Sequence, residues 1–281
     1  MSYTIKDYMG VPTPTWCPGC GMYSIKATIL QALVSLQIPP ENLVIVHDIG
    51  CNGNNAGGIH AYTIKSLHGR AIPPAIGVKY ANKDVKSIAI IGDGGNFWEG
   101  AAHWIATLQR NEDITILVYD NQIYGLTTGQ TSPTTQKGYP TKTYPHGTVD
   151  EPINPITTSI AAGATFVARG WVGDPNGLKD VLVQAIKHKG VSIVDILTQC
   201  VTWNNSFNHY KEVTYNLDDS YDPSKKMDAY KIAEDYSKIA LGVIYKKEAP
   251  TLEDKYPVLQ GKPLVHRIPD TNIEDLLEEF T

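Results

Sequence analysis

Several features of other protein classes are missing from this sequence. No run of about 18 or more apolar residues occurs, so we expect no membrane-spanning helix. The first residues, MSYTIKDYMG, lack a basic start followed by an apolar block, so we expect no secretory signal. Lysine and arginine (24) are fewer than aspartate and glutamate (29), and this net charge of −5 disfavours nucleic acid as a partner. We therefore expect a cytoplasmic protein.

Cysteine is scarce, with only four in 281 residues: Cys17, Cys20, Cys51 and Cys200. Without secretion, structural disulfides are disfavoured, and metal or redox chemistry explains the thiols better. The close pair in CPGC could form a disulfide, a redox dithiol, half of a zinc site or part of an iron–sulfur site. Structural zinc sites usually combine two close pairs, and only one is present here.

The order of apolar segments predicts the fold class. Short buried runs rich in β-branched residues alternate with amphipathic helices, and we find neither internal repeats nor low-complexity tracts. This alternation predicts an α/β fold, with a doubly wound, mainly parallel sheet and helices on both faces. The expected strands are 43–47, 87–91, 114–119, 164–169 and 192–197, and the expected helices are 22–36, 98–109 and about 177–188.

The composition also changes along the chain. Residues 125–155 are rich in Thr, Pro, Gly and Tyr, and an irregular segment of this length is usually either functional or disordered. After about residue 210 the sequence becomes more charged and helical, as in MDAYKIAEDYSKIALGVIYKK. We expect an α/β domain over 1–210 and a C-terminal extension or arm over 211–281.

Chemically informative residues follow several of the expected strands. Cys51, Asp93, Asn121 (after Asp120) and Cys200 each come shortly after a strand. In a doubly wound parallel sheet, ligands bind outside the carboxyl ends of the strands. We therefore expect these residues to lie along one edge of the sheet.

The segment GDGG, residues 92–95, suits a phosphate site. Its glycines allow the backbone to approach an anion, and the following helix directs N–H groups at it. Asp93, the side-chain carbonyl of Asn121 and the backbone carbonyl of Ile123 are oxygen ligands that suit Mg²⁺. A GDG alone is more often a turn, but this pairing across one strand–helix–strand unit is specific.

GDGG…DNQIYG resembles the thiamine-diphosphate motif. TPTWCPGCG, IGC at 49–51, LHGRA at 67–71, YGLTTGQTSPT at 124–134 and FVARG at 166–170 extend the likeness. Together, over about residues 12–205, they resemble the β subunit of archaeal-type 2-oxoacid:ferredoxin oxidoreductases.

The resemblance implies thiamine diphosphate, Mg²⁺ and one [4Fe–4S] cluster as cofactors. It assigns the cluster to Cys17, Cys20, Cys51 and Cys200, and Mg²⁺ to Asp93, Asn121 and Ile123. It also assigns thiamine-diphosphate contacts to Ile49, Gly50, Cys51, Asn52, His68, Gly94, Gly95, Gly125 and Leu126.

The implied activity is coenzyme-A-dependent oxidative decarboxylation of 2-oxoacids to acyl-CoA and CO₂. One-electron transfers would pass through the cluster to ferredoxin. The resemblance places the carboxylate that activates the cofactor on a partner α (or fused αγ) subunit. No convincing local candidate occurs here, because we assign Glu99 to the dipole of a helix start.

The chain departs from many relatives where they have GDGD or lysine. Gly95 replaces the second Asp, and Asn54 and Thr128 replace lysines that would favour a dicarboxylic substrate or coenzyme A. These differences favour small 2-oxoacids with neutral tails, such as pyruvate or 2-oxobutyrate. Two alternatives remain: a subunit of a non-redox thiamine-diphosphate decarboxylase, and a non-catalytic zinc or iron–sulfur interaction module.

Overall fold

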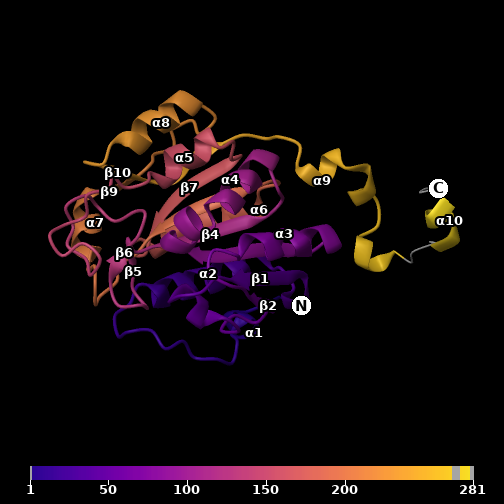
Figure 1. The fold of residues 1–281 in the computed structure, drawn as a ribbon, viewed down its shortest axis with the longest axis horizontal. Coiled ribbons are helices and arrows are strands. Elements are labelled where there is room, and N and C mark those ends of the chain that lie inside the picture. The colour runs from indigo at the N-terminus through magenta and orange to yellow at the C-terminus, as the bar shows by residue number, and fades with distance from the viewer. Residues whose placement is uncertain (1, 268–272, 279–281) are drawn as a thin grey trace.

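A computed structural model describes residues 2–267 and 273–278, and its main feature is an eight-stranded sheet (Figure 1). The strand order is β2-β1-β3-β4-β8-β7-β10-β9, and neighbouring strands run parallel except β7 and β10. This confirms the predicted mainly parallel, doubly wound sheet. The strands are β1 (Leu43–His47), β2 (Tyr62–Lys65), β3 (Lys86–Gly92), β4 (Thr115–Asp120), β7 (Phe166–Trp171), β8 (Ser192–Leu197), β9 (Thr214–Asn216) and β10 (Ile239–Lys246), with β5 (Ile123–Tyr124) and β6 (Gln130–Thr131) in a separate two-stranded sheet.

Helices cover both faces of the large sheet. Side chains of α1, α2, α6 and α7 pack on one face, and those of α3, α4, α5 and α8 pack on the other. Short 3₁₀ turns lie between these elements. The helices are α1 (Ile5–Tyr8), α2 (Met22–Leu36), α3 (Ile72–Ala81), α4 (Ala101–Arg110), α5 (Pro155–Ala161), α6 (Pro175–Lys187), α7 (Phe207–Val213), α8 (Lys226–Glu234), α9 (Leu252–Lys255) and α10 (Ile273–Glu278).

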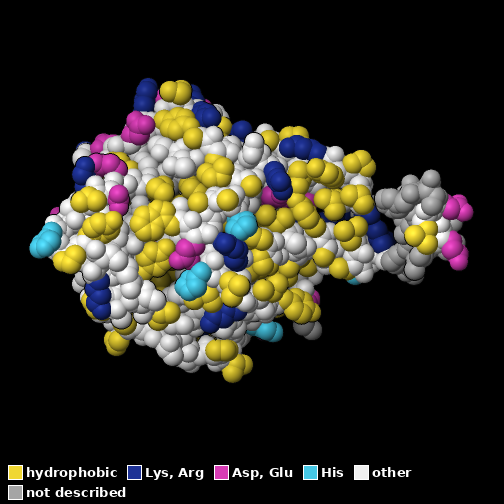
Figure 2. All heavy atoms as spheres, in the orientation of Figure 1, with side chains coloured by type: hydrophobic (Ala, Val, Ile, Leu, Met, Phe, Trp, Pro, Cys, Tyr) yellow, Lys and Arg dark blue, Asp and Glu magenta, His cyan; other side chains and the backbone are white. Residues whose placement is uncertain are grey.

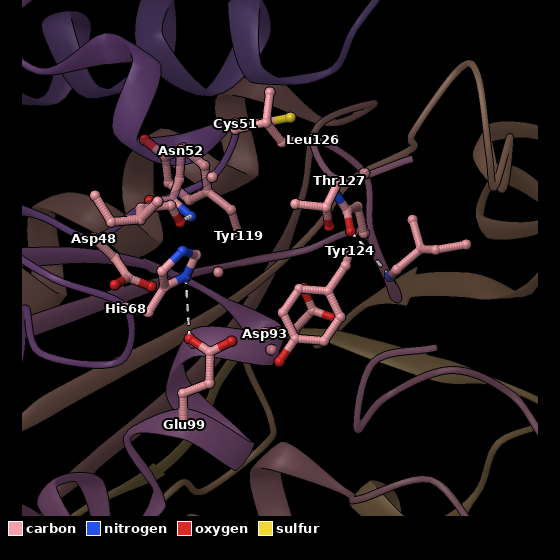
Figure 3. A pocket seen from close by; sticks show the side chains of 18 of the residues that line it. Asp48, Cys51, Asn52, His68, Asp93, Glu99, Tyr119, Tyr124, Leu126 and Thr127 are labelled. Carbon is pink, nitrogen blue, oxygen red and sulfur yellow. Dashed lines mark hydrogen bonds and ion pairs between the residues drawn. The ribbon is translucent and has the colours of Figure 1, made fainter. Parts of the chain in front are cut away.

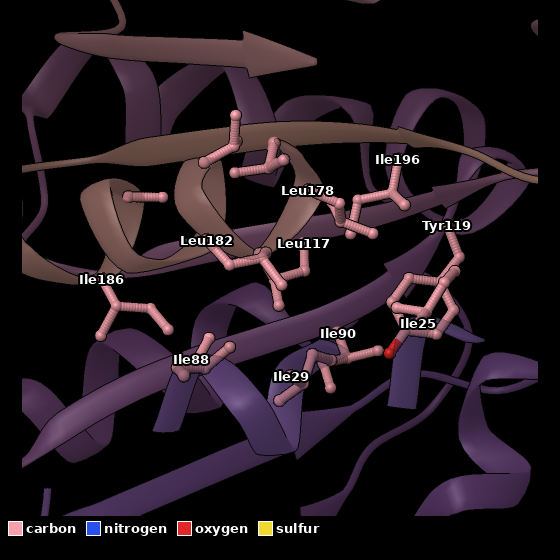
Figure 4. Close-up of a cluster of buried hydrophobic side chains, with 14 of the residues drawn as sticks. Ile25, Ile29, Ile88, Ile90, Leu117, Tyr119, Leu178, Leu182, Ile186 and Ile196 are labelled. Carbon is pink, nitrogen blue, oxygen red and sulfur yellow. The ribbon is translucent and has the colours of Figure 1, made fainter. Parts of the chain in front are cut away.

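The central strands supply side chains to both faces. In β3, Ile88 and Ile90 join the core under α2 and α6 (Figure 4), while Ala89 and Ile91 join the opposite core. Burying a side chain of the size of isoleucine contributes about 1.5 to 3 kcal/mol. Because both faces are covered, these strands are continuous apolar runs in the sequence.

The C-terminal part of the sheet differs from the sequence-based expectation. The stretch predicted to be helical over 227–247 forms a helix only as far as Glu234, and Ile239–Lys246 is strand β10. This part of the prediction is wrong because Leu241 and Ile244 alternate between the two cores, as side chains of a buried strand do. The domain boundary expected near residue 210 stays a prediction. Strands β9 and β10, which lie beyond it, belong to the same sheet as the strands before it.

Beyond β10 the chain leaves the sheet as an arm. In Figure 1 this segment passes through α9, where Leu252 donates its backbone N–H to the carbonyl of Asn111 at 3.3 Å, and α10 stands apart from the sheet. Hydrophobic side chains cover much of the arm in Figure 2, and Tyr256, Val258 and Val265 are more than half exposed. The assignment of 211–281 to a C-terminal extension or arm stays a prediction.

The irregular segment 125–155 is packed against the domain. Hydroxyl side chains within it are buried and bonded to one another; for example, Thr131 Oγ1 and Thr141 Oγ1 are 2.6 Å apart. Ile153 donates its backbone N–H to the carbonyl of Pro133 at 2.8 Å. Such bonds satisfy polar groups that would otherwise be buried without partners, so the segment holds a defined shape.

Candidate functional site

A cavity of about 310 Å³ opens at the carboxyl ends of β1, β3 and β4 (Figure 3). The structure brings together around it every residue that the sequence assigned to thiamine diphosphate or Mg²⁺. Their roles stay predictions, but their convergence is a structural finding. These lining residues are Ile49, Gly50, Cys51, Asn52, His68, Asp93, Gly94, Gly95, Asn121, Ile123, Gly125 and Leu126.

The GDGG segment leads into a turn of helix that the sequence did not predict. The chain continues from β3 into a π-helical turn, Gly95–Glu99, before α4 begins at Ala101, so the helix predicted over 98–109 is interrupted. Such turns occur frequently at functional sites. A Cβ on Gly95 would lie 1.9 Å from Oδ2 of Asp48, so a side chain there would require the Asp48 carboxylate to move.

Asp93 lies buried below this turn. Its Oδ2 accepts hydrogen bonds from Ser132 Oγ at 2.5 Å and from Thr134 Oγ1 at 2.8 Å. Burial raises the pKa of Asp93 to about 6, against the opposing effect of these two hydroxyls. A divalent cation beside the carboxylate would favour its charged form.

A second carboxylate lies behind Asp93. Thr134 Oγ1 is also 2.7 Å from Oδ1 of Asp120. A hydroxyl has a single proton to donate, so it can serve only one of the two carboxylates at a time. Burial, followed by the charges of Asp195 and Asp93, raises the pKa of Asp120 well above its usual value.

The DNQIYG segment places further oxygen atoms on the cavity wall. Asn121 Oδ1 accepts the backbone N–H of Ile123 at 3.0 Å, which turns the chain directly after β4. Asn204 Nδ2 donates to the carbonyl of Asn121 at 3.0 Å and fixes this turn from the other side. An amide oxygen has two lone pairs, so Asn121 Oδ1 can still accept a cation.

The four cysteines also gather at this edge. A Cβ on Gly125 would lie 3.3 Å from Cys200 Sγ and 3.9 Å from Cys51 Sγ. Burial raises the pKa of Cys51 to about 12, and the thiols of Cys20, Cys200 and Cys17 add to this shift because they lie near it. All four are free thiols, so the structure contains no disulfide among them.

Among residues 2–267 and 273–278, no group of three or more His, Cys, Asp or Glu side chains is arranged to hold a single metal ion. The expected Mg²⁺ ligand set contains only one such side chain, Asp93. Its other oxygens come from the amide of Asn121 and the backbone of Ile123. These oxygen donors fit the preference of Mg²⁺.

Sequence reasoning missed two carboxylates of the cavity wall. Asp48 Oδ1 accepts the backbone N–H of Gly69 at 2.8 Å, and burial raises the pKa of Asp48 to about 6. Glu99 Oε2 lies 3.2 Å from His68 Nδ1, and both side chains line the cavity (Figure 3). Glu99 was assigned only to a helix dipole, and its place on the cavity wall was not foreseen. The position of Asp48 directly before IGC was the available sequence signal.

Other lining residues missed from the sequence carry less chemistry. Tyr124 packs its ring against Gly94, so closely that a Cβ there would lie 2.3 Å from the ring carbon Cζ. The remaining ones add apolar surface, backbone or a hydroxyl to the wall. They are Met22, Gly92, Tyr119 and Thr127.

The fold and cavity define a thiamine-diphosphate-binding class of protein, and comparisons with known families agree. Residues 48–196 match the family described as thiamine pyrophosphate enzyme, C-terminal TPP binding domain. Residues 200–261 match the family described as the C terminal part of the pyruvate ferredoxin oxidoreductase beta subunit.

Individual relatives narrow the class to a family. The 2-oxoacid:ferredoxin oxidoreductase subunit beta of Saccharolobus solfataricus is 36% identical over 94% of this chain and 95% of its own length. The 2-oxoglutarate oxidoreductase subunit KorB of Mycobacterium tuberculosis is 41% identical over 71% of this chain and 54% of its own length. This chain belongs to the family of β subunits of 2-oxoacid:ferredoxin oxidoreductases.

A solved structure shows the same arrangement of elements. The 2-oxoglutarate:ferredoxin oxidoreductase of Magnetococcus marinus, with 2-oxoglutarate, coenzyme A and succinyl-CoA bound, superposes with a TM-score of 0.87 and 32% identity. The match covers 90% of this chain and 88% of that chain. In the part of this chain that the structure describes, no helix is both long and apolar enough to cross a membrane.

Proposed function

We propose that this chain carries thiamine diphosphate, Mg²⁺ and one [4Fe–4S] cluster in a 2-oxoacid:ferredoxin oxidoreductase. With an α (or fused αγ) subunit, it would catalyse the coenzyme-A-dependent oxidative decarboxylation of a 2-oxoacid to acyl-CoA and CO₂. Ferredoxin would receive the two electrons one at a time. A cytoplasmic location remains part of this prediction.

The observation that carries the proposal is that Cys51 belongs both to the cavity wall and to the group of thiols. This residue lines the cavity and also lies among the thiols, with Cys200 beside the same glycine. When bound, thiamine diphosphate supplies an electron sink for decarboxylation, and an adjacent iron–sulfur cluster accepts single electrons. A shared wall keeps the distance between the two short.

The residues of this chain would bind and orient the cofactor. Gly94 and Gly95 leave the backbone at the start of the π-helical turn without side chains, so that a diphosphate could approach it, and Asp93, with Asn121 and Ile123, would hold its Mg²⁺. Met22, Tyr119 and Leu126 add apolar surface that excludes water from the cavity.

The carboxylates of the cavity support a role for the partner subunit. Asp48 is bonded to Gly69, Asp93 to two hydroxyls, and Glu99 is paired with His68. None of these three is a free group poised to activate the cofactor. The α subunit would therefore supply the activating carboxylate, and the chain without it should be inactive.

The same carboxylates support a preference for substrates with a single carboxylate. Asp48 and Glu99 would repel the second carboxylate of a substrate such as 2-oxoglutarate. The absence of lysine at positions 54 and 128 acts in the same direction. We infer pyruvate or 2-oxobutyrate as preferred substrates, although the Magnetococcus marinus relative binds 2-oxoglutarate.

The test is a purification under strictly anaerobic conditions with the co-expressed α subunit. The complex should contain iron, sulfide and thiamine diphosphate, and should reduce an electron acceptor with a 2-oxoacid and coenzyme A. Colourless, zinc-containing protein would instead identify an interaction module. Decarboxylation without acceptor reduction would identify a non-redox decarboxylase. Either result would contradict the proposal.

A further inference from the structure

The loop that carries Cys200 folds over the CPGC segment. Gln199 Nε2 donates a hydrogen bond to the carbonyl of Gly19 at 3.1 Å. Thr202 Oγ1 donates to the sulfur of Cys17 at 3.6 Å, within the range of a hydrogen bond to sulfur. A loop distant in sequence thus places a hydroxyl donor on one of the thiols expected to bind the cluster.

The position of Thr202 is fixed by a closed turn. The backbone N–H of Cys200 donates to the carbonyl of Asn204 at 3.0 Å, and the N–H of Asn204 donates back at 2.9 Å. Within this turn, the carbonyl of Trp203 accepts a hydrogen bond from the hydroxyl of Tyr139 at 2.9 Å. The backbone of the turn is therefore anchored at Cys200, Trp203 and Asn204, and this places the exposed Thr202 side chain within hydrogen-bond reach of Cys17.

We propose that the Thr202 hydroxyl raises the reduction potential of the iron–sulfur cluster that Cys17 would bind. The inference rests on the proposed function, since it requires that cluster. Hydrogen bonds to ligating sulfurs are among the factors that set cluster potentials. A hydrogen bond to a ligating sulfur stabilises the reduced, more negative cluster more than the oxidised one, so the reduction potential of the cluster rises. The cluster would gain one electron from the bound cofactor and pass it to ferredoxin, and no bond to Thr202 would form or break.

Cys17 is the thiol at which such tuning would matter most. It is exposed, whereas Cys20, Cys51 and Cys200 are only partly exposed. Electrons passing to a protein acceptor would therefore leave by the Cys17 edge. In the structure the donor at this exposed sulfur is the Thr202 hydroxyl. Thr202 is thus a positioning residue for electron transfer and does not contact the substrate.

The matched variants are Thr202→Val, which keeps the shape but loses the donor, and Thr202→Ser, which keeps the donor. Thr63→Val is the control, because Thr63 is an exposed threonine of strand β2 that donates to the carbonyl of Ala61. The measurement is a redox titration of the anaerobic αβ complex, followed by the EPR signal of the reduced cluster.

We expect T202V to lower the equilibrium constant for one-electron reduction roughly three- to tenfold, where tenfold corresponds to about 59 mV. T202S and T63V should keep the wild-type potential. The titration is normalised to the signal of loaded cluster, so partial loading of T202V does not affect the result.

Distinct results would overturn the inference and the proposed function. Equal potentials in wild type and T202V, with the cluster present in both, would overturn the inference alone. Complete loss of the cluster from T202V, with retention in T202S, would overturn tuning in favour of a purely structural role. Wild-type complex without iron would overturn the proposed function as well.

Discussion

The sulfur atoms of Cys51 and Cys200 lie beside the same glycine. A side chain beginning at Gly125 would meet Cys200 Sγ at 3.3 Å and Cys51 Sγ at 3.9 Å. Cys51 follows β1 and Cys200 follows β8, and β3 and β4 separate these strands in the sheet. Because Gly125 has no side chain, both thiols can lie close to its backbone, so the expected cluster site and the cofactor cavity share a wall.

The steric demand at Gly95 gives a first prediction. Gly95→Ala should weaken thiamine-diphosphate binding, because the new methyl group would lie 1.9 Å from the Asp48 carboxylate and force that carboxylate to move within the cavity. Isothermal titration calorimetry on the purified complex measures the affinity. Gly77→Ala is the control, since nothing lies within 4 Å of a Cβ there and α3 should become slightly more stable. Unchanged affinity in G95A would remove Gly95 from the phosphate site.

The second prediction concerns the neighbours of Asp93. Ser132→Ala removes a hydroxyl that donates to Asp93 Oδ2 without removing the carboxylate itself. Losing a group that is hydrogen-bonded to a metal ligand typically weakens metal affinity about 10- to 100-fold. The Mg²⁺ concentration needed for half-maximal activity should rise by that factor. Ser35→Ala, which removes an exposed hydroxyl bonded only within α2, should leave it unchanged. The same Mg²⁺ requirement in both variants would argue against Asp93 as a ligand.

A third prediction follows from the raised pKa of Asp48. Its value in the folded protein is about 6, above the ordinary 3.8, so the folded state binds this proton more tightly than the unfolded state. The contribution of Asp48 to stability should therefore fall as the pH rises from about 4 to about 6, on the order of 1 to 3 kcal/mol. Asp48→Asn should remove this loss and keep the hydrogen bond from Gly69.

Melting temperatures of wild-type and D48N complexes between pH 4 and 7 test this point. The raised pKa of Asp93 acts in the same pH range but is common to both proteins, so their difference isolates Asp48. The melting temperature of D48N should rise relative to that of the wild type as the pH rises. A constant difference across the range would mean that Asp48 is ionised throughout in the folded protein.

A fourth prediction addresses substrate choice. Glu99→Gln removes a negative charge from the cavity wall, so kcat/KM for 2-oxoglutarate should rise relative to that for pyruvate. A unit charge about 4 Å away is worth about 1 kcal/mol even in bulk water, which corresponds to roughly fivefold or more in this ratio. The ratio cancels any general loss of activity. Glu41→Gln, at an exposed position outside the cavity, should not alter it. An unchanged ratio in E99Q would exclude Glu99 from substrate selection.

Much of the site could be predicted because a parallel sheet collects the ends of its strands on one edge. β3 and β4 are buried on both faces, so their apolar runs mark where Asp93 and Asn121 emerge. β2 was missed because all its residues are exposed, which leaves no apolar pattern. β10 was read as helix because the apolar spacing of a short segment does not distinguish strand from buried helix.

A different physical cause explains why some cavity residues were missed in the sequence. Asp48 and Glu99 gain their roles from contacts with Gly69 and His68, which lie on a separate loop. No local spacing encodes such contacts, since they depend on how the loop after β2 crosses the edge of the sheet. Thr202 belongs to the same group, because its contact with Cys17 joins two loops far apart in sequence.

The central claim is that the four thiols hold one cluster beside the cofactor cavity. Its most direct test is the iron and sulfide content of the anaerobic αβ complex, compared between wild type and Cys200→Ser. The account predicts about four irons and four sulfides per chain in the wild type, with an iron–sulfur absorption band that is lost or converted in C200S. The same iron content and spectrum in both proteins would contradict it.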